Sequence, residues 1–188
     1  MLRKFGDTGV DLRVDAFAGQ EFYGVEFFPE GSDRPFYAKS AQSLKTRSNM
    51  LMPLEIPERV RVVWREIDKP ITGKYGQMTY EGPLVGDYTI DVGSRIPQEV
   101  LESIRKEGGQ LRLKFRLGND GVYFGWDIER RPGYDPRKRD QRGNIIGADA
   151  VHFLAGGDFR EAEIFNGQVV RKGWYIDKKT GQRIDTDF

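Results

Sequence analysis

The sequence predicts a mainly β, β-rich α+β fold: an antiparallel sheet or sandwich of about eight to ten strands, with one main helix near residues 97–107. Three observations lead to this class. Several short segments alternate apolar and polar residues with the period of two that is typical of half-buried strands. The 23 glycines and nine prolines among 188 residues favour tight turns. Only one segment has helical spacing. The length of the chain suits a single domain over residues 1–188.

The first half of the chain contains four predicted strands. Residues 11–17 alternate strictly, and residues 21–28 follow a short turn as their expected hairpin partner. Residues 36–58 are polar in the middle and are expected to be mostly loop. Residues 59–67 alternate apolar and arginine side chains, and residues 86–93 alternate again, so both are predicted strands.

The helix is predicted within residues 95–109. Pro97 suits the first position of a helix, where the missing N–H is not needed. Val100, Leu101 and Ile104 form a narrow apolar stripe at helical spacing. Basic residues suit the last turn, and two glycines follow as a stop signal.

Two hairpins complete the pattern. Residues 110–130, "QLRLKFRLGNDGVYFGWDIER", predict two long strands joined by a tight turn, with the alternate apolar residues facing the core. Arg112, Lys114 and Arg116 fall on the opposite face and are expected to contact solvent. The C-terminal hairpin, within 161–188, contains an Asn–Gly pair that predicts a type I′ turn.

The residue types that support catalysis or metal binding are sparse. The chain has no cysteine, which excludes disulfides, thiolate metal sites and a cysteine nucleophile. His152 is the single histidine, and no serine lies in a G-x-S-x-G motif. No phosphate-binding glycine motif is present either. We therefore expect no enzyme activity, no cofactor and no metal, with His152 in a structural role.

The most basic stretch is residues 130–143, which hold five arginines and one lysine against two aspartates, whereas the whole chain carries a net charge of only +1. We expect a loop that leaves the sheet here. Such a loop can contact nucleic acid, contact an acidic protein surface, or simply be solvated.

The sequence also allows two other binding functions. Arg59, Arg61 and Arg65 form a second basic row, which would join the row on 112–116 into one nucleic-acid-binding face if the strands were adjacent. The tryptophans offer a sugar-binding platform if two of them lie exposed on one surface: Trp64, Trp126 and Trp174. The core is the more ordinary place for a tryptophan on an inward strand face.

The order of elements over residues 11–130 resembles a family of small lipoproteins of Gram-negative bacteria. The resemblance rests on "MPLEIPERVRVVWRE" (52–66), "GDYTIDVGSRIPQEVLESI" (86–104) and the hairpin of 110–130. Some members act as immunity proteins to type VI secretion lipase effectors. Those relatives carry a lipobox cysteine at the mature N-terminus, and this chain has none. Such a difference is expected if the chain begins after the lipidated cysteine.

The resemblance implies a non-catalytic immunity protein of the periplasm, tethered through a lipidated N-terminus, that binds and neutralises a secreted toxin of the lipase or phospholipase type. The N-terminus "MLRKFGDTGVD" has no apolar signal segment, so the sequence alone leaves a cytoplasmic location open. Segment 39–49 is a second candidate contact. The residues expected to bind the toxin are Arg130, Arg131, Tyr134, Arg137, Lys138 and Arg139.

Overall fold

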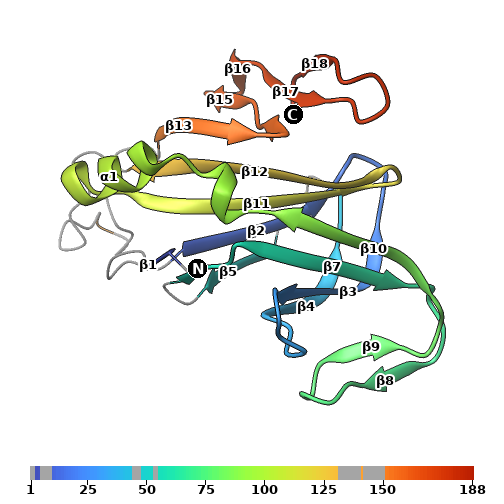
Figure 1. The fold of residues 1–188 in the computed structure, drawn as a ribbon. Helices are drawn as coiled ribbons and strands as arrows, with labels where there is room; N and C mark the ends of the chain where they lie inside the picture. Colours follow the sequence, from blue (N-terminus) through green and yellow to red (C-terminus); the bar gives the residue numbers. More distant parts are fainter. Residues whose placement is uncertain (1–2, 5–9, 44–47, 53–54, 131–140, 142–150) are drawn as a thin grey trace.

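The structure is a computed structural model that describes residues 3–4, 10–43, 48–52, 55–130, 141 and 151–188. These residues form eighteen strands, one α-helix and one 3₁₀ turn, and most strand pairs are antiparallel (Figure 1). The predicted mainly β class is confirmed. Nine strands of five or more residues make up two large sheets, in line with the expected count of about eight to ten. The other nine strands are shorter.

The larger sheet has five strands in the spatial order β13-β12-β11-β2-β5. β2 runs parallel to β11, with Leu12 opposite Leu113, whereas every other pair in this sheet is antiparallel. The sheet therefore joins the start of the chain to its middle. The bounds are β2 Val10–Ala16, β5 Ser48–Met52, β11 Gln110–Gly118, β12 Gly121–Arg130 and β13 Val151–Gly157.

The second sheet has four antiparallel strands in the order β10-β7-β3-β4. The bounds are β3 Phe22–Pro29, β4 Tyr37–Ala41, β7 Arg59–Arg65 and β10 Leu84–Asp91. The predicted hairpin between residues 11–17 and 21–28 was wrong, because β3 pairs with β4 and β7 and not with β2. The chain crosses from one sheet to the other between β2 and β3, so the two strands cover opposite sides of one core.

The apolar faces of the two sheets pack against each other to form that core. Phe27 of β3 meets Phe115 of β11 edge-on at a centroid distance of 5.0 Å, and it meets Tyr37 of β4 at 5.1 Å. Both phenylalanines are almost fully buried. The alternation read from the sequence thus identifies the core-facing residues of both sheets correctly.

Short strands fill the segments between the large ones. Segment 36–58, expected to be mostly loop, contains β4, β5 and β6; in β4 the buried Tyr37 and Ala41 flank an exposed Lys39, an alternation too short to stand out in a polar stretch. The remaining bounds are β1 Arg3–Lys4, β6 Glu55–Ile56, β8 Pro70–Thr72, β9 Met78–Tyr80, β14 Phe159–Arg160, β15 Glu163–Phe165, β16 Gln168–Arg171, β17 Gly173–Ile176 and β18 Arg183–Thr186.

The C-terminal strands lie against the face of the five-stranded sheet that points away from the core (Figure 1). The predicted turn of the C-terminal hairpin is present between β15 and β16. Asn166 and Gly167 have φ angles of 50° and 76°, the two positive values that a type I′ turn requires. Residues 159–188 therefore add a third layer to the sandwich.

The predicted helix is confirmed as α1, Gln98–Glu107, which follows the 3₁₀ turn η1, Gly93–Arg95. Pro97 precedes the first helical residue, and the expected apolar stripe is buried against the sheets. Gly108 ends the helix with a φ of 74°, a left-handed conformation that glycine adopts freely. No helix in the described part of the chain is long and apolar enough to cross a membrane.

The neighbours Phe27 and Phe28 provide a matched test of this architecture. Phe27 is fully buried between the sheets, whereas Phe28 points to the opposite face and is partly exposed. We expect Phe27→Ala to lower the free energy of unfolding by about 3–5 kcal/mol, because it leaves a cavity in the core. Phe28→Ala should cost far less. Urea denaturation of both variants checks this, and equal losses would contradict the packing described here.

Candidate functional site

Arg130 is the one predicted toxin-binding residue that the structure describes. It ends β12, and its side chain is 14% exposed. The guanidinium donates hydrogen bonds from Nε to the Gly108 carbonyl (2.9 Å) and from Nη2 to the Ser103 hydroxyl (2.6 Å), and Nη1 pairs with Glu107 at 3.2 Å. Arg130 therefore caps the C-terminal end of α1. The other five lie outside the described residues: Arg131, Tyr134, Arg137, Lys138 and Arg139.

The end of α1 beside Arg130 is itself basic. Arg105 and Lys106 occupy the last helical turn, where positive charge is favoured by the helix dipole, and both side chains are exposed. The chain passes from Arg130 directly into the basic segment 131–139. That segment thus starts at a fixed point next to an exposed basic helix end. The second candidate, segment 39–49, spans the end of β4, the start of β5 and residues outside the described part.

The basic row on β11 is not at the surface, and the expectation that it faces solvent was wrong. Arg112, Lys114 and Arg116 are only 4%, 2% and 2% exposed. Their alternation with apolar residues correctly places them on the second face of the sheet. The C-terminal layer covers that second face, however, so its polar side chains are buried.

Strand register places an acid beside each buried arginine. Arg112 lies opposite Asp127 of β12, and Arg116 lies opposite Asp15 of β2. Arg112 donates two hydrogen bonds to Asp127 (2.5 and 2.6 Å), and Lys114 donates a third to the same carboxylate (2.8 Å). Arg116 grips Asp15 through two more, at 2.9 and 3.0 Å. We call these five side chains the buried charge layer.

The C-terminal layer completes the buried charge layer from above. Glu161 lies between the three cations, with its carboxylate oxygens 3.9 Å from Arg112, 3.6 Å from Lys114 and 3.5 Å from Arg116. The Phe159 ring lies over Arg116, 4.5 Å from Cζ to the ring centroid. A carboxylate and an aromatic face are both attractive to cations, so this segment is matched to the charges it covers.

Asp158 fastens the same segment to the sandwich. Its carboxylate accepts two hydrogen bonds from Arg95 (2.5 and 3.2 Å) and one from the backbone N–H of Phe124 (2.9 Å). Its own backbone N–H donates to the Phe124 carbonyl at 2.6 Å. Gly157 precedes it with a φ of 107°, and a Cβ there would lie 2.3 Å from that carbonyl oxygen, so only glycine fits.

The second arginine row belongs to the other sheet. Arg61 on β7 forms two hydrogen bonds with Asp87 on β10 (2.8 and 2.6 Å), and the side chains are 52% and 45% exposed. Because β7 and β11 lie in different sheets, and the β11 row is buried, the two rows do not form the continuous basic face that a nucleic-acid interface of this kind would need.

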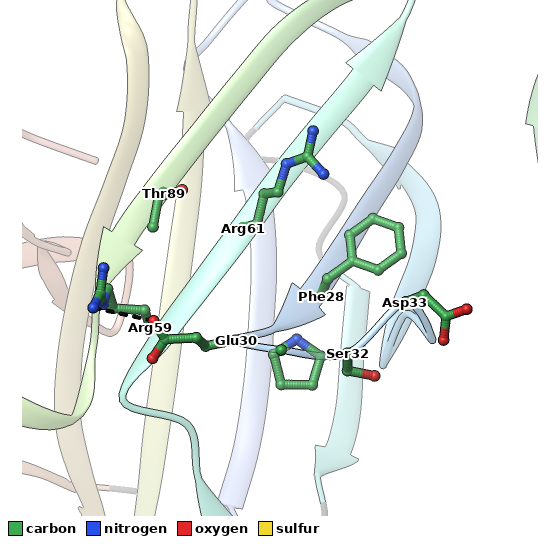
Figure 2. A pocket seen from close by; sticks show the side chains of 9 residues that line it. Phe28, Glu30, Ser32, Asp33, Arg59, Arg61 and Thr89 are labelled. Carbon is green, nitrogen blue, oxygen red and sulfur yellow. Dashed lines mark ion pairs between the residues drawn. The ribbon is translucent and has the colours of Figure 1, made fainter. Parts of the chain in front are cut away.

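A hollow of about 610 Å³ opens on the outer face of the four-stranded sheet (Figure 2). Arg59 and Arg61 reach into it from β7, beside Phe28 at the end of β3. Arg59 pairs with Glu30 at 3.1 Å and is 52% exposed. The hollow therefore mixes arginines with carboxylates that already balance them. Its full lining is Phe28, Pro29, Glu30, Gly31, Ser32, Asp33, Arg59, Arg61 and Thr89.

The β8–β9 hairpin is tied to the rim of this hollow. Lys74 donates to Asp33 at 2.6 Å, and the Tyr75 hydroxyl bonds to the same carboxylate. Gln77 donates to the buried Glu26 at 2.9 Å, farther along β3. Both Lys74 and Arg34 also lie over the Tyr75 ring. This cluster holds the hairpin turn against the sheet by polar contacts, and the Tyr80 ring of β9 packs over Gly24 of β3.

The tryptophans do not form the sugar-binding platform considered from sequence. Trp64 and Trp126 are 7% and 6% exposed and belong to the core. The Trp126 indole N–H donates to the Arg95 carbonyl at 3.0 Å, which satisfies its one polar atom. Trp174 is partly buried beneath Arg183. His152 is in β13 opposite Glu129, and its side chain is outside the described part of the structure.

Comparison of the chain with protein-family models, with curated proteins and with solved structures finds no match in any of the three. Within the described ranges, no group of three histidine, aspartate or glutamate side chains is placed to hold a metal ion.

Two arginine–aspartate pairs with similar geometry test the buried charge layer. Arg116→Met should cost about 3–5 kcal/mol of unfolding free energy, because it leaves Asp15 buried without its main partner. Arg61→Met should cost under about 1 kcal/mol, because its pair with Asp87 is exposed. Chemical denaturation measures both. The double variant Asp15→Leu/Arg116→Met should recover much of the loss, and similar costs for both single variants would contradict the assignment.

Asp127 predicts an acid-dependent stability. Burial alone would raise the pKa of Asp127, but the charge of Lys114 and the hydrogen bonds from Arg112 outweigh it and hold that pKa well below its usual range. The stabilising contribution of the carboxylate is thus present above its unfolded pKa of about 3.9 and is lost as the pH falls below that value. We expect Asp127→Asn to be less stable than wild type near neutral pH.

The stability gap between wild type and Asp127→Asn should shrink as the pH is lowered below about 4, because the wild-type carboxylate then becomes protonated on unfolding. Urea midpoints measured over a pH series check this. The exposed Asp87→Asn serves as the matched control and should show a small gap throughout. A gap for Asp127→Asn that stays constant with pH would contradict the role given to this carboxylate.

Proposed function

We propose that this chain is a non-catalytic immunity protein that binds and neutralises a secreted antibacterial toxin, a type VI lipase or phospholipase effector. The resemblance of residues 11–130 to immunity lipoproteins suggests the partner. The periplasm is the proposed location, with tethering through a lipidated N-terminus. The structural observation that carries the proposal is the position of Arg130 beside the basic end of α1.

A binding segment gains affinity when its first residue is anchored to a rigid part of the fold, because less conformational entropy is then lost on binding. Arg130 supplies that point, since its guanidinium is held by three backbone or side-chain partners around the end of α1. Arg105 and Lys106 extend the basic character of the following segment onto the folded surface. An acidic surface on a partner protein is the complement of this region.

Neutralisation by occlusion requires no chemistry from the immunity protein. Arginine and aromatic side chains commonly provide most of the binding energy at protein interfaces. In this proposal the segment blocks the entrance to the toxin's active site, and the residues that contact the toxin are Arg131, Tyr134, Arg137, Lys138 and Arg139. Arg130, which is 14% exposed, also positions the start of this segment.

A nucleic-acid-binding function is less well supported, because the two arginine rows lie in separate sheets and the β11 row is buried. The platform of tryptophans considered for carbohydrate binding is also disfavoured, because two of the three are in the core. The exposed Arg105 and Lys106 beside Arg130 support the choice of a protein toxin over these two alternatives.

Affinity capture tests the proposal. The purified chain is used to capture proteins from an extract of the native organism, with a high-salt wash, and bound proteins are identified by mass spectrometry. The expected result is one protein retained in equal molar amount that hydrolyses phospholipid vesicles and loses this activity when the chain is added. Retention of nucleic acid alone, released by salt, would overturn the proposal, because phosphate contacts weaken steeply with salt.

Charge reversal of Arg137→Glu and Arg139→Glu should weaken binding of the captured toxin by about a thousandfold, since each loss of a charge pair at an interface costs about 2 kcal/mol or more. The variant Lys69→Glu/Lys172→Glu changes the net charge equally at side chains that are 72% and 67% exposed elsewhere. Surface plasmon resonance compares the two. Equal affinities of the two double variants would show that the basic segment is not part of the interface.

A further inference from the structure

A second hollow, of about 400 Å³, lies where the turn between β11 and β12 meets the C-terminal strands. It is at the opposite end of β12 from Arg130 and α1 (Figure 1). Segments far apart in the sequence line it: Phe17, Ala18, Gln20, Asn119, Asp120, Tyr123, Tyr175, Asp177, Lys179 and Phe188. It shares no lining residue with the hollow of Figure 2.

Three aromatic rings form the floor of this hollow. Phe17 meets Tyr123 at a centroid distance of 5.0 Å and Tyr175 at 5.3 Å, and all three rings are steeply inclined to one another. Tyr123 is 1% exposed, whereas Phe17 and Tyr175 are partly exposed. The floor is therefore apolar and firmly packed, with two of its rings reaching the open space.

Polar groups surround the floor, and each is held in place through one atom. Gln20 accepts a hydrogen bond from the backbone N–H of Asn119 (2.8 Å), which fixes its amide group. Asp120 accepts the Tyr123 hydroxyl at 2.6 Å. Asp177 accepts the backbone N–H groups of Lys179 and Thr180 through a single oxygen, at 2.8 and 2.7 Å.

Hydrogen-bonding capacity remains at these groups for a ligand. Within the described residues, no hydrogen bond engages the Gln20 amide nitrogen or the Asn119 side chain. The Asp177 carboxylate also accepts the Thr180 side chain, and its oxygens can accept further hydrogen bonds. These atoms and the Lys179 ammonium offer both donors and acceptors around one apolar floor. An apolar surface with a few convergent, oriented polar groups is the usual composition of a small-molecule site.

The chemistry of the floor favours a neutral ligand over a cation. Cations of the protein already lie on two of the three rings: Lys178 is 4.7 Å from the Tyr123 centroid, and Arg116 is 5.7 Å from that of Phe17. Lys178 and Lys179 are offset by the carboxylates of Asp120 and Asp177, so the hollow carries no net charge that would favour a charged ligand. A pyranose has C–H bonds that suit the negative face of an aromatic ring, and its hydroxyls both donate and accept hydrogen bonds.

We propose that this hollow is a binding site for a neutral pyranose sugar, which would stack on Phe17 and Tyr175 and bond through its hydroxyls to Gln20, Asn119 and Asp177. The site is independent of the proposed toxin interface, because it lies at the other end of β12. It also differs from the platform of tryptophans considered from sequence, since none of its residues is a tryptophan.

Titration of the isotope-labelled chain followed by NMR tests this proposal. Glucose, galactose, mannose and N-acetylglucosamine are added separately at millimolar concentrations, and tetramethylammonium serves as the competing cation. We expect at least one sugar to cause saturable shifts confined to the backbone amides around Gln20, Asn119 and Lys179. Tetramethylammonium should not saturate the same amides.

Asn119→Ala removes an exposed side chain and should weaken sugar binding about tenfold or more with no change in the unfolding temperature. Tyr175→Ala should abolish the shifts, and Gln168→Ala, on the exposed strand β16, is the matched control with unchanged affinity. The proposal is overturned if no sugar gives saturable shifts, if the shifts lie elsewhere on the chain, if tetramethylammonium saturates the site instead, or if Asn119→Ala and Gln168→Ala bind sugar equally.

Discussion

The ion pairs of the buried charge layer are the constraint on which the rest of the architecture depends. Charges removed from water are tolerated only when partners satisfy them, and here each arginine finds an aspartate on the neighbouring strand. A register slip by one residue would put those charges in the apolar core and the core residues among the charges. The pairs therefore specify the alignment of three strands more strongly than apolar packing would.

The sequence predicts the strands well because each is a local pattern. Alternation identified six of the nine large strands, namely β2, β3, β7, β10, β11 and β12, but not β4, β5 or β13. Pro97 and the following stripe identified α1, and Asn166–Gly167 identified a turn. The sheet partners were not predictable in this way. β2 pairs with a strand about a hundred residues away, and nothing local distinguishes that partner from β3. The burial of Arg112, Lys114 and Arg116 was missed for the same reason, because it depends on a layer formed by the last thirty residues of the chain.

The candidate sites differ in the same way, because one is contiguous in the sequence and the other is not. The basic segment 130–143 is contiguous, so its charge is visible in the sequence, although the capping role of Arg130 depends on the packing of α1 against the end of β12. The hollow proposed to bind a pyranose is formed by segments far apart in the sequence, and no local pattern connects them. Only the composition of its turns, rich in asparagine, aspartate and glycine, offers a signal, and that composition is equally typical of turns without a ligand.

The parallel pairing of β2 with β11 also has a consequence for how the chain reaches this structure. Val10–Ala16 leaves the ribosome early, yet its central neighbour, Gln110–Gly118, is synthesised about a hundred residues later. Contacts between such distant segments raise the contact order of a protein, and high contact order slows folding. Until β11 is synthesised, one edge of β2 lacks its partner strand, and this edge is open to association with other chains. The pairing of β2 with β11 aligns the charges in the folded protein. The same pairing means that the large sheet of the nascent chain can form only after β11 has been synthesised.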